Sequence, residues 1–246
     1  MDLAGCTASS LVAVLLDGPD RSLSPVVRTS VSVHYETGLE ELPVLCVATP
    51  GAVLLPNAVV VDTLPAAGPL RVRSRGLSAG TVTWRVRRWF APPRPTGLVP
   101  PLVLPDLPVP VPVRCDVPLP GPSYDALVPA ALVGAGPGLT PAGDDVLAGA
   151  LVTAHATGDP RLPSWRAATR TALVSRRTTA VSRGLLRHAL DGWATPELAA
   201  YLTALCSGDP LEDPRQRLLG VGSTSGAALM AGVHHTLSTR LRQGAA

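Results

Sequence analysis

The chain contains no lysine and no isoleucine, and all 21 of its Lys-plus-Arg residues are arginine. Without lysine, the protein cannot form a Schiff base with a carbonyl substrate. It also cannot complete a Walker-type phosphate loop, in which the lysine of Gly-Lys-Ser/Thr contacts the phosphates. Any bound phosphate must therefore be held by arginine, by backbone N–H groups or by a metal ion.

Cysteines and long apolar runs are scarce as well. The four cysteines, Cys6, Cys46, Cys115 and Cys206, lie far apart and form no Cys-x-x-Cys pair, which predicts reduced, buried thiols. No apolar run reaches the roughly 18 residues of a membrane span, and no basic segment precedes the apolar residues 11–16. We therefore expect a cytoplasmic protein with no membrane partner.

Strong charge asymmetry is also absent. The net charge of +3 is spread along the 246 residues. The one dense basic stretch, Arg71 to Arg88, alternates with apolar residues as an amphipathic strand does. This pattern favours the solvated face of a sheet over a nucleic-acid contact, so we expect no nucleic-acid partner.

The first third of the chain has the pattern of β structure. Between Val26 and about Phe90, alternating or apolar runs are interrupted by Gly and Pro at short intervals. The expected strands cover residues 29–35, 44–48, 58–61 and 81–86. Because no helical pattern separates them, they predict an antiparallel sheet or a small barrel in a β-rich domain, residues 1–91.

The remainder of the chain divides into a proline-rich segment and a helical half. Residues 92–129 hold 13 of the 27 prolines, which excludes an interior helix or a central strand. Apolar residues between these prolines predict an extended connector packed on the domains. Residues 130–246 are expected to form a helical domain with anion-binding glycine loops, and the fold class is therefore α+β. The expected helices cover residues 143–157, 165–177, 178–190, 196–206 and 225–242.

The most informative motif is the central loop, Gly136 to Asp145, which contains Gly136, Gly138, Gly143, Thr140 and two adjacent acids at the start of a helix. Free N–H groups at a helix start attract anions, and glycine lets a ligand approach closely. A plainer interpretation is that Thr140 caps the helix while the acids interact with its dipole. Asp144 and Asp145 point about 100° apart on a helix, so they would share a hard cation such as Mg²⁺ only together with water or ligand.

Two further segments have a similar character. The second glycine loop, residues 220–226, contains Gly222, Ser223, Thr224, Ser225 and Gly226 before another small-residue helix. It could hold a phosphate or carboxylate, or simply cap a closely packed helix. The threonine segment, residues 178–182, brings Thr178, Thr179 and Ser182 within about one turn, which is also typical of a capped helix start.

The order of these three segments resembles the AllH family. The resemblance is carried by GxGPGLTPxGDDxLxG at residues 134–149, TTxxSxxLLxxA at residues 178–189 and LLxxGxxSGxxLxxG at residues 218–232. It extends weakly into the first half, through the Pro56-Asn57 turn and the tryptophan Trp89. The first motif is highly specific, whereas the N-terminal similarity is not.

This resemblance implies an enzyme subunit of oxamate carbamoyltransferase, a transferase of purine and allantoin breakdown that works beside other subunits. The implied reaction converts oxalurate and phosphate into oxamate and carbamoyl phosphate, all small dense anions. Asp144 and Asp145 would be the catalytic residues, or the ligands of a metal ion. The residues implied in substrate binding are Gly136, Gly138, Thr140, Gly143, Thr178, Thr179, Ser182, Gly222, Ser223, Thr224, Ser225 and Gly226. Donors to the reacting carbonyl would be loop amides, Arg176 or Arg177.

Two other functions remain open. The second glycine loop also resembles the phosphate loop of galactokinase-type small-molecule kinases, which would imply ATP binding. That family places its loop between β-rich segments, whereas the surrounding pattern here is helical. Because the sequence offers no clear base or nucleophile, a non-catalytic subunit that binds an anion is the third possibility.

Overall fold

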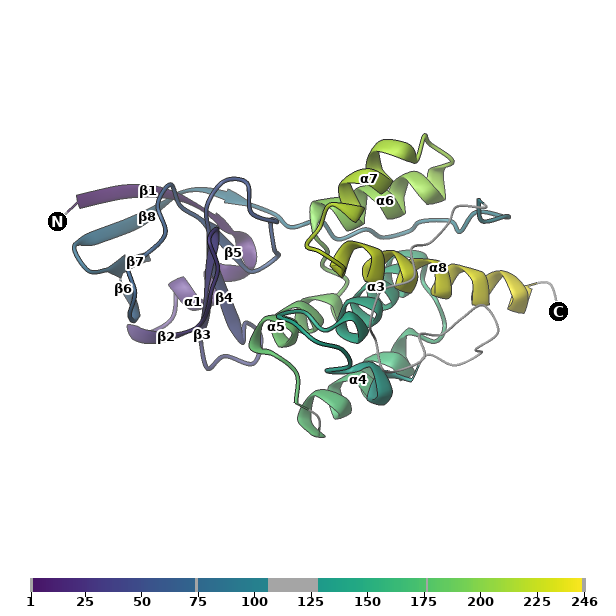
Figure 1. Cartoon of the computed structure of the whole chain (residues 1–246), viewed down its shortest axis with the longest axis horizontal. Coiled ribbons are helices and arrows are strands. Elements are labelled where there is room, and N and C mark those ends of the chain that lie inside the picture. The colour runs from purple at the N-terminus through teal and green to yellow at the C-terminus, as the bar shows by residue number, and fades with distance from the viewer. Residues whose placement is uncertain (1, 74, 106–127, 176, 245–246) are drawn as a thin grey trace. The chain divides into compact units, whose positions relative to one another are not determined.

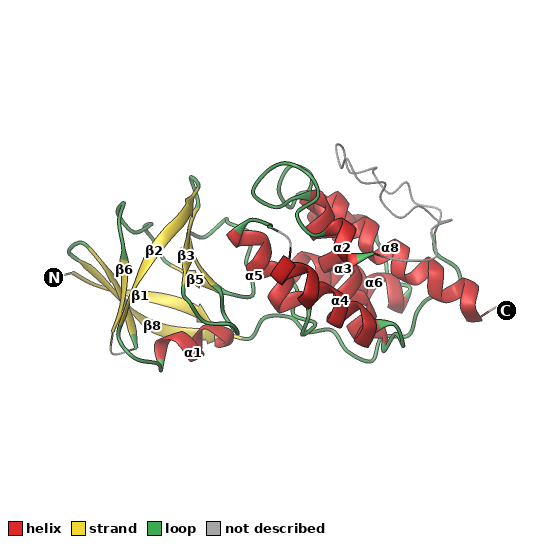
Figure 2. Cartoon of the chain, turned by 90° about the horizontal axis from the view of Figure 1, so that it is seen from below, coloured by secondary structure: helices red, strands yellow, loops and turns green. Residues whose placement is uncertain are grey.

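The computed structural model describes residues 2–73, 75–105, 128–175 and 177–244 of the chain. It divides into two compact units, Met1–Pro92 and Pro93–Ala246 (Figure 1). The first unit is built from strands and the second from helices (Figure 2). The α+β class, with an N-terminal β-rich part and a C-terminal helical part, is therefore confirmed.

The first unit is a closed barrel in which the strands follow the order β1-β5-β4-β3-β2-β6-β7-β8. Two neighbouring pairs, β1 with β8 and β4 with β5, are parallel, and the other pairs are antiparallel. The strands are β1 Asp2–Ser9, β2 Arg21–Arg28, β3 Ser32–Glu36, β4 Val44–Ala48, β5 Ala58–Val60, β6 Leu70–Arg73, β7 Gly76–Ala79 and β8 Val82–Phe90. Of the two arrangements expected from the sequence, the small barrel is the one that forms.

Buried apolar residues alternate with exposed residues along the strands, and the buried ones form the core of the barrel. In β6, Leu70 and Val72 are buried while Arg71 and Arg73 are exposed, as expected for an amphipathic strand. A 3₁₀ turn, Ser10–Val12, and the short helix α1, Ala13–Leu16, follow β1, and Leu15 and Leu16 are buried in the same core. Cys6 and Cys46 are buried free thiols, Cys206 is free and half-buried, and Cys115 lies outside the described residues.

The strand predictions need correction at several places. The strand expected over residues 29–35 begins only at Ser32, because the Thr29 side chain accepts the N–H of Ser32 and forms a turn there. Strands β2 and β7 were not among the expected strands, and neither was β1, whose residues are small and polar and have low β propensity. Hydrogen bonding to β5 on one side and β8 on the other stabilises it instead.

The second unit packs its helices around α3 (Figure 2). All residues of α3 except His155 are buried, and α2, α4, α5 and α8 contact it. The helices are α2 Pro129–Leu132, α3 Ala142–Thr157, α4 Leu162–Ser175, α5 Ala180–Ala189, α6 Pro196–Ser207, α7 Glu212–Leu219 and α8 Ser225–Gly244. The five predicted helices are all present. Helices α2 and α7 were not predicted, since α2 spans four residues and α7 buries only Leu218.

The start of the proline-rich segment lies along the helical unit. Pro93 accepts the N–H of Ala194, and Leu98 donates its N–H to Ala156. The central part of the predicted connector, residues 106–127, lies outside the described residues. None of the helices in the described ranges combines the length and the apolar character needed to cross a membrane.

Candidate functional site: two buried aspartates between three helix starts

Helix α3 begins without a side-chain cap. Its N-cap residue is Pro141, and the plainer expectation that Thr140 caps this helix is wrong. Backbone carbonyl groups of the same chain accept the first N–H groups of the helix instead. Gly143 donates to the carbonyl of Ala135, and both Asp144 and Asp145 donate to the carbonyl of Pro141. The hydroxyl of Thr140 is therefore available for a contact elsewhere.

Asp144 links the central loop to the threonine segment. Its side chain is 2 % exposed. One oxygen, Oδ1, accepts the N–H of Gly134 at 2.8 Å, and the other, Oδ2, accepts the hydroxyl of Thr178 at 2.5 Å. Burial raises the pKa of Asp144, while hydrogen bonds from Thr178 and Gly134 and the nearby hydroxyl of Ser182 oppose this rise. Both carboxylate oxygens thus have protein donors.

Asp145, also 2 % exposed, has a different environment. Its Oδ2 atom has no hydrogen-bond partner among the described residues. Burial raises the pKa of Asp145 to about 7, the hydroxyls of Ser225 and Thr140 lower it, and the charge of Asp144 raises it. Such a carboxyl group changes its protonation state near neutral pH, which is the property that a proton-transfer residue needs.

Hydroxyl groups from the other two segments complete the cluster. Thr140 and Ser225 are hydrogen-bonded to each other through their side-chain oxygens at 2.8 Å. Thr179 caps α5 by accepting the N–H of Ser182, and its hydroxyl donates to the carbonyl of Leu139. The three segments singled out in the sequence therefore meet at one place, although 85 positions separate Thr140 from Ser225.

All of these residues lie within one recognised region of sequence. Residues 132–237 match the family model described as "Oxamate carbamoyltransferase subunit AllH". This stretch is similar to the AllH family. The match confirms the family predicted from the three segments. No curated protein and no solved structure gives a significant match to the chain.

The glycines of the AllH region have two separate structural roles. A Cβ atom on Gly143 would lie 2.3 Å from the carbonyl oxygen of Leu132, and one on Gly226 would lie 1.8 Å from that of Leu218. These two glycines therefore allow close backbone packing. Gly138 and Gly222 instead have positive φ angles of 99° and 58° and are exposed to solvent.

The second glycine loop carries donors that face no protein acceptor. The structure records no acceptor for the N–H groups of Gly222, Ser223 and Thr224 within the ranges it describes. Gly222 and Ser223 are exposed, and the left-handed conformation of Gly222 is typical of backbone turns that gather N–H groups around an anion. Because Ser225 follows directly, this loop adjoins the cluster at Asp145.

Two further polar groups were singled out from the sequence. The hydroxyl of Ser182 is buried and lacks a hydrogen-bond partner in the described part of the chain, although it lies near enough to Asp144 to lower its pKa. Arg177 is exposed, and a Cβ on Gly134 would lie 2.4 Å from its carbonyl oxygen. Arg176 lies outside the described residues.

The donor set does not fit a metal ion held by the protein. Protein donors already occupy both oxygens of Asp144, and Asp145 is protonated over part of the neutral pH range. No group of three or more His, Cys, Asp or Glu side chains in the described ranges could hold a metal ion. Magnesium is usually held by one or two carboxylates together with water and substrate oxygens, so Asp144 and Asp145 do not by themselves form a closed metal site.

Proposed function

We propose that the protein is the AllH-type subunit of a carbamoyltransferase that acts on a small ureido carboxylate, with oxalurate and phosphate as one substrate pair and oxamate and carbamoyl phosphate as the other. One observation carries the proposal. A buried carboxyl group, Asp145, has a pKa near neutrality and lies beside hydroxyls from two separate helix starts. The family match over the same residues supports this assignment.

The surroundings of Asp145 suit small anions. The hydroxyls of Thr140 and Ser225 share one hydrogen bond in the free protein and could turn toward a ligand oxygen instead. The N–H groups of the second glycine loop provide further donors without any lysine. We assign substrate binding to Gly138, Thr140, Gly222, Ser223, Thr224 and Ser225.

Carbamoyl transfer requires one proton to move at the attacking nitrogen. In the direction of oxalurate, the oxamate nitrogen attacks the carbamoyl carbon, the C–O bond to phosphate breaks, and the nitrogen loses a proton. In reverse, a phosphate oxygen attacks the ureido carbonyl carbon, the C–N bond breaks, and the leaving nitrogen gains a proton. We assign both proton transfers to Asp145, because a carboxyl group with a pKa near 7 accepts and releases protons efficiently at neutral pH.

The carbonyl oxygen gains negative charge in either direction. A donor aimed at that oxygen lowers the activation barrier by roughly 3 kcal/mol. The unoccupied N–H groups of residues 222–224 are our candidates for this role. Arg177 is a further cation on the helix start that carries Thr178 and Thr179.

Asp144 is given a positioning role. Asp144 belongs to the central loop, and its carboxylate accepts hydrogen bonds from Gly134, just before that loop, and from Thr178, before α5. It therefore fixes the central loop relative to the threonine segment. It does not need to touch the substrate for this purpose. Gly136, Gly143, Thr178, Thr179, Ser182 and Gly226 likewise shape the site through the backbone or through contacts among themselves.

The activity test follows ¹³C-labelled carbamoyl phosphate and oxamate by NMR. It uses the purified protein alone and together with the subunits that copurify with it. Replacing Asp145 with asparagine is expected to lower kcat by at least about 100-fold, the usual contribution of a proton-transfer group. The exposed Asp209, on the turn after α6, is the matched control, and Asp209→Asn should keep wild-type activity.

Opposite pH profiles are expected for the two directions. Oxalurate formation needs ionised Asp145, so kcat/KM should rise with pH and level off above about 7. Phosphorolysis of oxalurate needs the protonated form, so its kcat/KM should fall above the same pH. Parallel profiles in the two directions would remove Asp145 from the proton-transfer role.

Other outcomes would replace the proposal. If the protein binds oxalurate but supports no transfer even with its partner subunits, it is a non-catalytic anion-binding subunit. Hydrolysis of ATP that depends on a small alcohol would favour the kinase instead. Wild-type transfer by Asp145→Asn would show that the proton moves through another group.

A further inference from the structure

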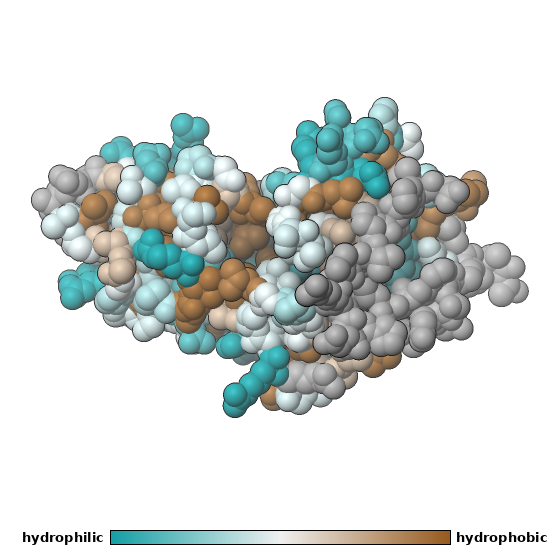
Figure 3. Space-filling view, viewed as in Figure 1, coloured by the Kyte–Doolittle hydropathy of each residue, from teal (hydrophilic) through white to brown (hydrophobic). Residues whose placement is uncertain are grey.

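The barrel unit contains a pocket that lies outside the AllH region. Its volume is about 220 Å³, enough for several water molecules or one small organic acid, since a water molecule occupies about 30 Å³. Apolar surface gathers on this unit (Figure 3), and Val26 is 39 % exposed. The lining residues are Pro25, Val26, Val27, Arg28, Val33, Tyr35, Ala67 and Gly68.

The pairing of β2 with β3 builds this pocket. Arg28 lies opposite Val33, and Pro25 lies opposite Tyr35, with an irregularity between Pro25 and Val27. Directly opposed residues of an antiparallel pair project from the same face. Since Val33 and Tyr35 belong to the barrel core, Arg28 projects from the core-facing side, yet it is exposed. This combination places Arg28 at an open end of the barrel, where barrels commonly bind ligands.

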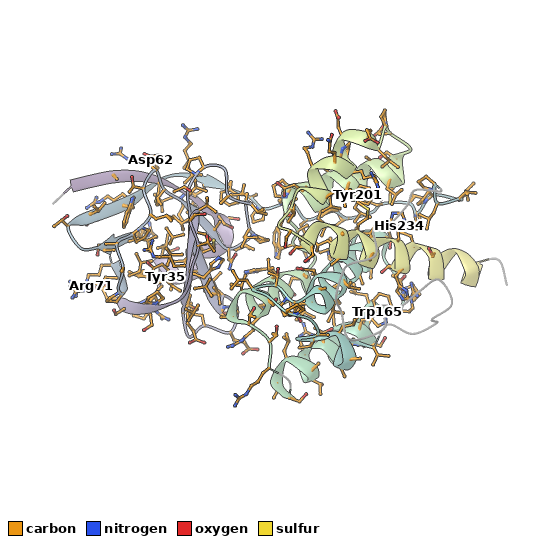
Figure 4. All side chains as sticks on the ribbon, in the orientation of Figure 1. Tyr35, Asp62, Arg71, Trp165, Tyr201 and His234 are labelled. Atoms are coloured by element: carbon orange, nitrogen blue, oxygen red, sulfur yellow. The ribbon has the colours of Figure 1, made fainter. Side chains whose placement is uncertain are left out.

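Tyr35 provides an unpartnered polar group at this place. Its side chain is 0 % exposed and points into the barrel, unlike Arg71 (Figure 4). No described residue hydrogen-bonds to its hydroxyl. A buried hydroxyl without a partner costs about 1–3 kcal/mol, so the site would gain stability from an acceptor.

Arg28 supplies a complementary charge. Burial raises the pKa of Tyr35, and the Arg28 charge opposes that rise, so the guanidinium lies within electrostatic reach of the hydroxyl. One guanidinium nitrogen of Arg28 donates to the carbonyl of Pro65. A guanidinium has five N–H donors in a planar fork, which leaves donors for a carboxylate.

We propose that this pocket is a binding site for a short-chain monocarboxylate, whose carboxylate faces Arg28 and the Tyr35 hydroxyl while its hydrocarbon part packs on the exposed Val26. The walls favour an apolar tail, and the cation favours an ionised head group. The volume suits a ligand of a few carbon atoms. The site belongs to the barrel unit and is independent of the carbamoyl-transfer proposal.

The test is a ligand-detected NMR titration of the full chain with butyrate and with butyramide, which has the same shape but no charge. Butyrate is expected to bind with a Kd on the order of 1–10 mM, as suits a ligand of six non-hydrogen atoms. Butyramide should bind at least about tenfold more weakly, because a hydrogen bond to a charged group contributes more than a neutral one.

Three variants test whether butyrate binds in this pocket. Arg28→Gln should weaken butyrate binding about tenfold and Tyr35→Phe about fivefold, given the usual strength of charged and neutral hydrogen bonds. Tyr35→Phe keeps the buried ring and removes only the unpartnered hydroxyl, so its melting temperature should be unchanged or higher. Arg71→Gln, on the exposed face of β6, is the matched control and should bind like wild type.

Three results would overturn the proposal. These are the absence of butyrate binding at 50-fold the upper expected Kd, equal binding of butyrate and butyramide, and wild-type binding by both pocket variants. If Tyr35→Phe raises the melting temperature while butyrate does not bind to wild type, the pocket holds only water. Loss of carbamoyl transfer in Asp145→Asn would have no bearing on any of these results.

Discussion

Replacing Asp145 with asparagine is expected to raise the free energy of unfolding at pH 8 by on the order of 2–4 kcal/mol. The reason is the burial of a carboxylate that ionises only near pH 7 in the folded chain, whereas its ordinary pKa is 3.8. Above pH 7, the folded protein holds a negative charge that is 2 % exposed, and one of its oxygens has no partner among the residues that the structure describes. Asparagine has a similar shape and no charge, so the variant avoids this cost.

The gain should depend on pH in one direction. Between pH 3.8 and about 7, the folded chain keeps the proton of Asp145 while the unfolded chain releases it. Raising the pH through this interval therefore destabilises the wild-type protein relative to the variant. At pH 4.5 the difference between the two proteins should shrink to less than about 1 kcal/mol.

Urea unfolding followed by circular dichroism at 222 nm, where the helices dominate, measures this effect at pH 8 and pH 4.5. Asp209→Asn is the control, because Asp209 is exposed and the substitution should change neither value. A variant less stable than wild type at pH 8 would show that ionised Asp145 is well solvated or paired. A gain in stability together with a loss of transfer would identify a group whose burial serves catalysis at the expense of stability.

Gly149→Ala and Gly232→Ala are each expected to destabilise the helical unit by about 2–3 kcal/mol, although alanine normally favours a helix. A Cβ on Gly149 would lie 2.2 Å from the carbonyl oxygen of Leu229, and a Cβ on Gly232 would lie 2.1 Å from that of Val146. Both obstacles are backbone atoms, so α3 and α8 would have to separate. The same two helices carry Asp145 and Ser225, and carbamoyl transfer should therefore fall as well.

Thermal unfolding and the transfer assay measure the two consequences. Gly220→Ala is the control, because Gly220 has an ordinary helical φ and its nearest contact would be 3.4 Å away. It should leave the melting temperature within about 1–2 °C of wild type, since the change in stability is a few tenths of a kcal/mol. If Gly149→Ala and Gly232→Ala were both as stable as wild type, this result would contradict the close crossing of α3 and α8.

The helices and the family could be predicted from the sequence because their signals are local. Small residues after a glycine loop mark α3 and α8, and the predicted ranges differ from the observed ones by a few residues. Strand β1 and helix α7 gave no such signal. Pairing on both edges stabilises the small, polar β1, whereas α7 is charged and buries only Leu218. The hydrogen bonds and contacts that stabilise them come from distant parts of the chain.

The segments singled out in the sequence lie together in the structure, but the different environments of their residues could not be predicted. Adjacent helical positions point about 100° apart, and in the structure Asp144 and Asp145 have different surroundings. Asp144 has a hydrogen-bond donor for each carboxylate oxygen because Gly134 and Thr178 lie beside it. This arrangement depends on the tertiary structure. The roles of the glycines are equally non-local, because Gly226 meets the Leu218 carbonyl while Gly138 meets nothing within 4 Å.

The central claim is that the three helix starts around Asp145 form one substrate site. The most direct test is a crystal structure of the protein grown with oxalurate and phosphate. We expect ligand oxygens within hydrogen-bond distance of the Thr140 and Ser225 hydroxyls and of the N–H groups of residues 222–224, with the reacting nitrogen near Asp145. Ordered oxalurate bound elsewhere in the AllH region, with the Thr140–Ser225 hydrogen bond intact, would contradict the account.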